Sequence, residues 1–184
     1  MSDNSKEYLM MREEILQYLE QYQVVRNMMY IVTGTLLGFG VNGTEDRTRY
    51  LFLLPLIVII PSYIVAIDYA KCVRKTSAYL AVFHEQKEDC LFHWESRHRM
   101  FGYYIKPWRV NAQLLPYYIC GITCFGLYFS RINYTNYLDV LVGVTLFVIS
   151  LGVILLFKNI KYSDYLNAWE NVKDDEMRKN NDDK

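Results

Sequence analysis

Four long, mostly apolar runs constrain the fold of this 184-residue chain more than any other feature of the sequence. They cover approximately residues 27–41, 51–67, 112–130 and 138–157. A helix of roughly 20 apolar residues crosses the ~30 Å hydrocarbon core of a bilayer. Helices are favoured there because lipid offers the backbone no hydrogen-bond partners. The sequence therefore predicts an all-α integral membrane protein with four membrane-spanning helices.

The alternative of a soluble helical bundle is disfavoured. Four such runs in a chain of this length would leave too little polar surface to cover them, although 22% of the residues are charged. None of the runs alternates with period two, so strands are not expected. The run 27–41 is the shortest, and it reaches full length only with Val24 and Val25 or with a snorkelling Arg26. Prolines at 55, 61 and 116 predict kinks in the second and third runs.

Lys and Arg are distributed unequally over the segments between the runs. Seventeen of the twenty lie before the first run, between the second and third, or after the fourth. The other two loops hold only Arg47, Arg49 and Arg131. Cytoplasmic loops of membrane proteins carry an excess of Lys and Arg. We therefore expect both termini and the long loop 71–111 to face the cytoplasm.

Residues 5–26 are predicted to form an amphipathic helix that leads directly into the first run. Apolar residues recur there at spacings of three and four: Tyr8, Met11, Ile15, Tyr18, Tyr22 and Val25. Glu and Gln occupy the other faces, so this seam resembles about three heptads. The seam has three interpretations: packing on the chain's own cytoplasmic hairpin, pairing with a second copy, or binding to a lipid surface. The negative net charge of the helix weakens the third.

The remaining polar segments divide the chain into a cytoplasmic amphipathic helix at 1–26, a four-span membrane domain at 27–157 and a charged tail at 158–184. Within the membrane domain, the second span is predicted to continue as a helix through residues 78–83 and to turn near 86–89. A second helix would complete a cytoplasmic hairpin over 71–111. The tail begins with an aromatic stripe, and its charged end is expected to be disordered.

The densest group of reactive side chains lies in residues 83–98 of the predicted hairpin. Cys90 and His93 are three residues apart and form a weak candidate for half of a zinc site. The rest of the group follows no recognised ligand spacing, so a salt-bridged polar turn is the preferred interpretation. The four cysteines, at 72, 90, 120 and 124, are interpreted as reduced.

Small residues mark candidate helix-packing faces in two runs. Gly34 and Gly38 are four residues apart in the first, and Gly121 and Gly126 lie in the third. Glycines let helix backbones approach closely in lipid, either within one chain or between copies. Acidic and basic residues are missing from the centre of every run, which argues against a secondary transporter. A pore lined by neutral residues of several copies is compatible with the sequence.

Four short stretches carry a resemblance to known sequences: KEYLMMREEI at 6–15, PLIVIIP at 55–61, YLAVFHE at 79–85 and HWE at 93–95. They resemble a family of small bacterial multi-pass membrane proteins, in which an acidic–Arg–Glu–Ile helix precedes two spans and an F-x-E … W-E motif follows on the cytoplasmic side. The resemblance covers about residues 7–99, and no activity is attached to it. It implies a bacterial inner (plasma) membrane and singles out Glu85, Trp94 and Glu95 as an interaction motif. We interpret these three residues as bracing the hairpin.

No catalytic signature stands out, so we expect a non-enzymatic membrane protein that self-assembles through its glycine faces and its seam. It would act as a pore, as a membrane effector in bacterial defence, or as a scaffold for a cytoplasmic partner. The alternative is a ligand- or lipid-sensing membrane protein, followed by a metal-dependent membrane enzyme. The expected partners are the lipid bilayer, further copies of the chain and a cytoplasmic protein. Neither a cofactor nor nucleic acid is expected.

Overall fold

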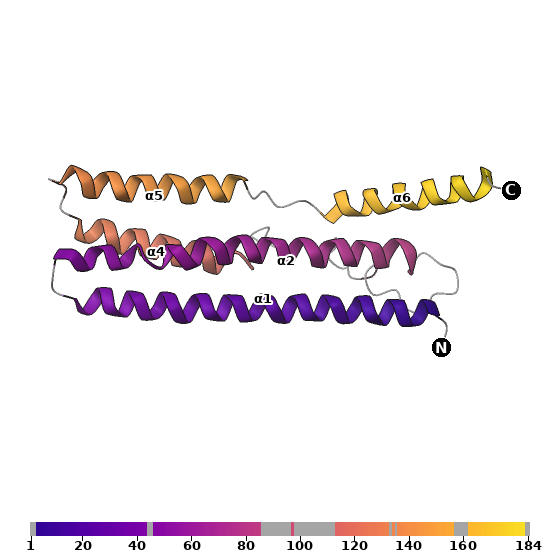
Figure 1. Cartoon of the computed structure of the whole chain (residues 1–184), viewed down its shortest axis with the longest axis horizontal. Coiled ribbons are helices and arrows are strands. Elements are labelled where there is room, and N and C mark those ends of the chain that lie inside the picture. Colours follow the sequence, from indigo (N-terminus) through magenta and orange to yellow (C-terminus); the bar gives the residue numbers. More distant parts are fainter. Residues whose placement is uncertain are drawn as a thin grey trace. The chain divides into compact units, whose positions relative to one another are not determined.

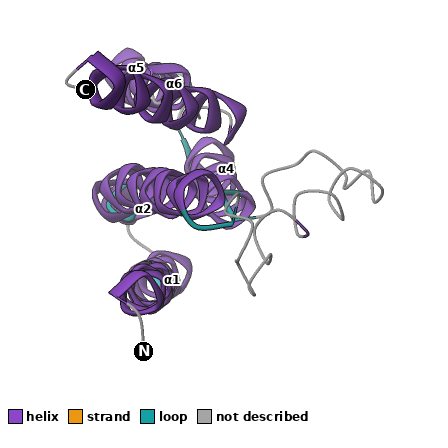
Figure 2. Ribbon diagram, turned by 90° about the vertical axis from the view of Figure 1, so that its right-hand side faces the viewer, coloured by secondary structure: helices purple, strands orange, loops and turns teal. Residues whose placement is uncertain are grey.

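The computed structural model describes residues 3–43, 46–85, 97, 113–132, 134, 136–156 and 162–182. The described residues form five α-helices and one 3-10 helix (Figure 1): α1 (Asp3–Asn42), η1 (Asp46–Phe52), α2 (Leu56–Phe83), α4 (Leu115–Arg131), α5 (Tyr137–Leu156) and α6 (Tyr162–Asp182). Figure 2 shows helices and loops but no strand in these ranges. The prediction of an all-α protein is confirmed.

Three of the described helical segments are long and apolar enough to cross a membrane. They are Ser5–Asn42, Thr48–Phe83 and Tyr137–Leu156. These segments support a membrane location for the protein. Helix α4, which corresponds to the predicted third span, has only 17 residues and is not one of the three.

The helix boundaries agree with the apolar runs except at the start of α2. Helix α1 is continuous over 40 residues, so the predicted amphipathic helix does lead directly into the first run. The second run begins with η1 and a turn, and α2 starts only at Leu56. Pro55 therefore precedes α2, and Pro116 lies in the first turn of α4. Proline is compatible with the first turn of a helix, so Pro116 does not interrupt α4. The second run is interrupted by a turn at Pro55, and Pro61 lies inside α2, where the kink stays a prediction.

The prediction of disorder at the charged end of the tail is also wrong. Helix α6 continues through residues 162–182, where disorder was expected from residue 173 onward. Opposite charges spaced four residues apart, such as Asp174 with Arg178 and Asp175 with Lys179, stabilise a helix in a polar sequence. Composition alone predicts disorder here because it does not include the spacing of the charges.

The chain packs as two compact units. Unit 1 comprises Met1–Gln21, Asp68–Arg109 and Asn159–Lys184, and unit 2 comprises Tyr22–Ile67 and Val110–Lys158. Helices α1 and α2 each contribute one part to unit 1 and the other part to unit 2. All of α6 belongs to unit 1, whereas α4 and α5 belong to unit 2.

The core of unit 1 forms where the N-terminal half of α1 packs on the C-terminal half of α2. Tyr8, Ile15 and Leu80 are buried together, and partly buried apolar residues surround them: Met11, Leu19, Val73 and Tyr79. The two helices are antiparallel here, because Glu7 contacts Tyr79 while Tyr18 contacts Tyr69. Tyr8 and Ile15 of the predicted seam thus pack on α2 of the same chain, which is the first of the three interpretations of the seam.

The core of unit 2 gathers side chains from α1, η1, α2 and α4. Met29, Phe52, Ile67 and Tyr128 are fully buried in it. Two helical glycines permit close approaches of aromatic rings: a Cβ at Gly40 would lie 2.8 Å from the Phe52 ring, and a Cβ at Gly143 would lie 2.7 Å from the Tyr128 ring. Helices α4 and α5 are joined by a short connection, and Phe125 and Phe147 meet edge-on at 5.3 Å between them.

Candidate functional site

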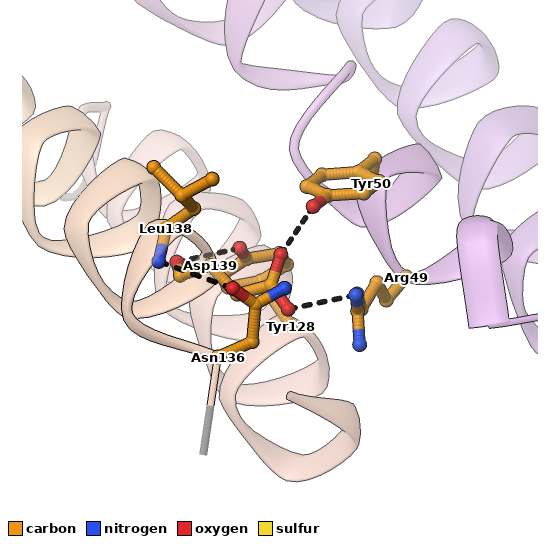
Figure 3. Close-up of polar contacts among 6 residues, drawn as sticks. All are labelled: Arg49, Tyr50, Tyr128, Asn136, Leu138 and Asp139. Carbon is orange, nitrogen blue, oxygen red and sulfur yellow. Dashed lines mark hydrogen bonds and ion pairs between the residues drawn. The ribbon is translucent and has the colours of Figure 1, made fainter. Parts of the chain in front are cut away.

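A buried polar cluster in unit 2 joins η1 to the start of α5 (Figure 3). Asp139 is 0% exposed, and its Oδ2 lies 2.7 Å from Nη2 of Arg49. The Tyr50 hydroxyl donates a hydrogen bond to Oδ1 of the same carboxylate. The Tyr128 hydroxyl of α4 donates to the Asp139 backbone carbonyl at 2.8 Å. One aspartate therefore ties together three separate elements of unit 2.

The local sequence explains how Asp139 is held. It lies in the first turn of α5, where a carboxylate interacts favourably with the positive end of the helix dipole. Asn136 precedes the helix, and its side-chain oxygen accepts a hydrogen bond from the Leu138 N–H at 3.3 Å. The Arg49–Asp139 contact satisfies an ion-pair distance, but Asp139 Oδ2 accepts no well-oriented hydrogen bond from the described residues. We therefore regard this contact as electrostatic attraction more than as a directed bond.

Arg131, at the end of α4, makes a second polar link in unit 2. Its guanidinium donates hydrogen bonds to three backbone carbonyls at the C-terminal end of α1: those of Gly40 at 3.1 Å, Val41 at 3.3 Å and Gly43 at 3.3 Å. It also lies over the Phe52 ring at 5.4 Å. A cation at this place satisfies carbonyls that have no partner within the helix. Arg49 and Arg131, which the sequence suggested were simple loop charges, hold helix ends in place.

A second cluster lies in unit 1, where the Glu7 carboxylate lies between two side chains of the α2 end. The Tyr79 hydroxyl donates to Glu7 Oε1 at 2.6 Å, and His84 Nε2 lies 3.6 Å from Glu7 Oε2. His84 is buried and meets the Tyr8 ring at 6.0 Å. At 3.6 Å the histidine contact is longer than a hydrogen bond, and it becomes an ion pair only when His84 is protonated. The cluster can therefore fasten the N-terminal part of α1 to α2.

Helix α6 joins this cluster through one aromatic and one basic side chain. The Trp169 ring lies edge-on to Tyr79 at 5.2 Å, and its Nε1 donates to the Lys75 carbonyl at 3.2 Å. Lys173 Nζ donates to the Val82 carbonyl at 3.2 Å, one residue before α2 ends at Phe83. Lysine at the C-terminal end of a helix satisfies a free carbonyl and complements the helix dipole. Unit 1 is thus built from α1, α2 and α6 together.

The residues of the predicted interaction motif are only partly described. Glu85 is 3% exposed, and its backbone N–H donates to the Leu80 carbonyl at 3.1 Å beyond the end of α2. Trp94 and Glu95 lie outside the described residues, as do the weak metal candidates Cys90 and His93. Within the described ranges, no three His, Cys, Asp or Glu side chains are grouped closely enough to hold a metal ion. Cysteines 72, 120 and 124 are free thiols.

The four predicted packing glycines face open space in the single chain. A Cβ added at Gly34, Gly38, Gly121 or Gly126 would meet no described atom within 4 Å. The described glycines that do permit close packing within the chain are Gly40, Gly43 and Gly143. The glycine faces were predicted to pack either within one chain or between copies. The described residues show no close packing at these four glycines within the chain. Packing between copies stays a prediction.

Each unit also contains a cavity. In unit 1 a cavity of about 420 Å³ is lined partly by Glu14, Cys72, Lys75 and Trp169. In unit 2 an apolar groove of about 320 Å³ lies between α2, α4 and α5, and Tyr63, Tyr117 and Tyr118 line one part of it. The Tyr63 and Tyr118 hydroxyl oxygens are 3.1 Å apart and share a hydrogen bond.

Comparison with known proteins adds no assignment: no protein-family model, curated protein or solved structure matches this chain. The resemblance to small bacterial multi-pass membrane proteins therefore stays a prediction based on its motifs. The Arg49–Asp139 cluster was missed by sequence reasoning, because loop charges were counted only for topology. The available signal was that Asp139 is the one acidic residue inside the fourth apolar run.

Proposed function

We propose that the chain is a four-span membrane protein that self-assembles in the bilayer and acts as a scaffold for a cytoplasmic partner. Helix α4 supplies the fourth span in this proposal. Seventeen residues at a rise of 1.5 Å give about 26 Å, close to the hydrocarbon thickness of ~30 Å. Its one charged residue, Arg131, lies at its end, where it can reach the interface. With four spans, both termini lie on the same side, and the Lys and Arg distribution puts that side in the cytoplasm.

The observation that carries the self-assembly proposal is the uncovered face of α1. Only 17% of the apolar window of α1 is buried by the rest of the chain, and 11% of that of α5, so lipid or other copies must cover the remainder of both. What distinguishes α1 is a pair of glycines on its uncovered face. Gly34 and Gly38 are both exposed, and they lie on roughly the opposite side of α1 from the buried Met29 and Gly40. Small residues at this spacing let a second helix approach closely in lipid.

Unit 1 is the part we assign to the cytoplasmic partner. Its seam is already occupied, since Tyr8 and Ile15 pack on α2, so pairing of copies through the seam would require this core to open. Leu9, Met10 and Leu16 remain exposed on other faces of the same helix segment. Exposed apolar side chains on a polar helical unit favour a protein contact.

The assembly proposal is tested by adding bulk to the glycine face. We expect the full-length Gly34→Ile/Gly38→Ile variant in lipid nanodiscs to shift from oligomer to monomer in native mass spectrometry. Gly34→Ala/Gly38→Ala should keep the oligomer, because alanine is still small. Gly152→Ile is the matched control, since its site in α5 is equally open. A monomeric wild type, or an equal loss of oligomer in the control, would refute the proposal.

Measurement of the membrane potential separates a scaffold from a pore. Overexpression of the wild-type chain in bacterial cells should leave the membrane potential unchanged if the assembly is a scaffold. Depolarisation that disappears in Gly34→Ile/Gly38→Ile would instead identify a pore formed by the same assembly. In that case the self-assembly part of the proposal would stand, and the scaffold part would be wrong.

A further inference from the structure

Two polar groups of unit 2 are buried without hydrogen-bond partners among the described residues, near the N-terminal end of α4. They are the hydroxyl of Tyr117, whose residue is 2% exposed, and Nε of Arg26. The Tyr22 hydroxyl donates to the Gln113 carbonyl at 2.5 Å, which holds this part of α1 beside the residue that precedes α4 by two positions. Arg26 lies over the Tyr22 ring at 5.5 Å. Arg26 lies one helical turn after Tyr22, and Tyr117 lies four residues after Gln113, so this hydrogen bond places both groups in the same region. Buried polar groups are normally satisfied, so this pair indicates a missing partner.

An anion would satisfy both groups and the positive charge of Arg26. Within the described ranges Arg26 contacts the Tyr22 side chain and forms no ion pair with an acidic side chain. Helix α4 begins without a side-chain cap at Leu114 and without an acidic residue in its first turn. The positive end of its dipole is therefore uncompensated by this segment of the chain. Arg26 and Tyr117 would both donate hydrogen bonds, and neither offers a negative charge.

An apolar groove lies next to the proposed anion site. The Tyr117 ring also lines the groove of about 320 Å³, together with apolar side chains such as Ile60, Phe125, Phe147 and Leu151. Tyr117 thus borders both the unsatisfied polar groups and the groove. A ligand that fits both has a negatively charged head and a hydrocarbon chain.

We propose that Arg26 and Tyr117 bind the phosphate of an anionic phospholipid, and that one of its acyl chains occupies the apolar groove of unit 2. Arg26 lies one residue before the first apolar run, at the depth where headgroups meet the hydrocarbon. A guanidinium forms paired hydrogen bonds with two phosphate oxygens, and the Tyr117 hydroxyl adds a third donor. The inference rests on the membrane insertion in the proposed function, but it does not require self-assembly.

The test uses the full-length chain in detergent, mixed with equimolar phosphatidylglycerol and phosphatidylcholine of identical acyl chains. Native mass spectrometry then reports which lipid stays bound to the monomer. We expect the wild type to prefer phosphatidylglycerol by about fivefold or more, the effect of one cation near an anionic headgroup. Arg26→Gln should abolish this preference, and Arg178→Gln, which removes an exposed charge from α6, should retain it.

Tyr117→Phe separates binding from folding. It removes an unsatisfied hydroxyl, so the thermal stability of the lipid-free protein should stay equal or rise, while retention of phosphatidylglycerol falls about twofold to tenfold. Glycerol phosphate is the probe for a headgroup without chains, and it should bind far more weakly than the lipid.

Three outcomes would overturn the inference: equal binding of both lipids, equal loss in Arg26→Gln and Arg178→Gln, or glycerol phosphate binding as tightly as phosphatidylglycerol. Failure of self-assembly is distinguished from these, because the lipid count is taken on the monomer peak. Failure of membrane insertion is distinguished by flotation of the expressed chain with membranes.

Discussion

Asp139 is the side chain on which the polar cluster of unit 2 depends. Its carboxylate is fully buried, and burial of an unpaired charge costs several kcal/mol. The Arg49 guanidinium, 14% exposed, and the Tyr50 hydroxyl offset this cost. Removal of either charged partner would leave the other largely buried without an opposite charge. Replacement of both by apolar residues removes the two charges together.

This reasoning gives a prediction for single and double substitutions. Asp139→Leu and Arg49→Met should each destabilise the protein by about 3 kcal/mol, and the double variant should lose clearly less than the sum. The measurement is equilibrium unfolding of the detergent-solubilised chain. Asp68→Leu is the matched control, because its 3.4 Å pair with Lys71 is exposed and contributes ~1 kcal/mol or less. If Asp139→Leu costs no more than Asp68→Leu, the cluster does not stabilise unit 2.

At the scale of elements, the contact between α4 and α5 depends on one glycine. Gly143 faces the Tyr128 ring, which is fully buried and is fixed by its hydrogen bond to the Asp139 carbonyl. A ring held in this way has little freedom to move aside for a methyl group. The next glycine of α5, Gly152, faces open space. A side chain is therefore excluded at Gly143 but can be accommodated at Gly152.

We expect Gly143→Ala to destabilise the chain by about 1–3 kcal/mol through overpacking. Gly152→Ala should be neutral or stabilising by up to ~1 kcal/mol, because alanine has the higher helix propensity and meets no atom there. Thermal unfolding of both variants in the same detergent checks the difference. Equal melting temperatures would show that α5 can shift away from α4 without cost.

The elements themselves could largely be predicted from the sequence, whereas their contacts could not. Hydropathy and three-four spacing locate α1, α2, α4 and α5, since both properties depend only on residues that are close together in the sequence. A glycine spacing carries no information on what faces it, so Gly34 and Gly38 were singled out while Gly143 was not. The Arg49–Asp139 pair joins residues 90 positions apart in sequence. Only the fold brings them together, and counting loop charges for topology hides such a pair.

At the scale of the whole molecule, the two units differ in chemical character. Unit 1 contains the cluster of Glu7, Tyr79 and His84 and the polar helix α6, and unit 2 contains the apolar segments of all four proposed spans. Three charged side chains of unit 2 that contact described partners, Arg49, Arg131 and Asp139, lie at helix ends. This division is what a chain needs if one unit is in lipid and the other is in water.

Cysteine labelling in intact bacterial cells tests the resulting topology. Two exposed residues serve as reporters: Tyr134, which is 71% exposed between α4 and α5, and Met177, which is 50% exposed in α6. In a background with Cys72 and Cys90 replaced by serine, Tyr134→Cys should react with a membrane-impermeant maleimide in intact cells. Met177→Cys should react only after permeabilisation if the tail lies in the cytoplasm, as the Lys and Arg excess predicts. Reaction of both reporters in intact cells would mean that α5, which lies between them, does not cross the membrane.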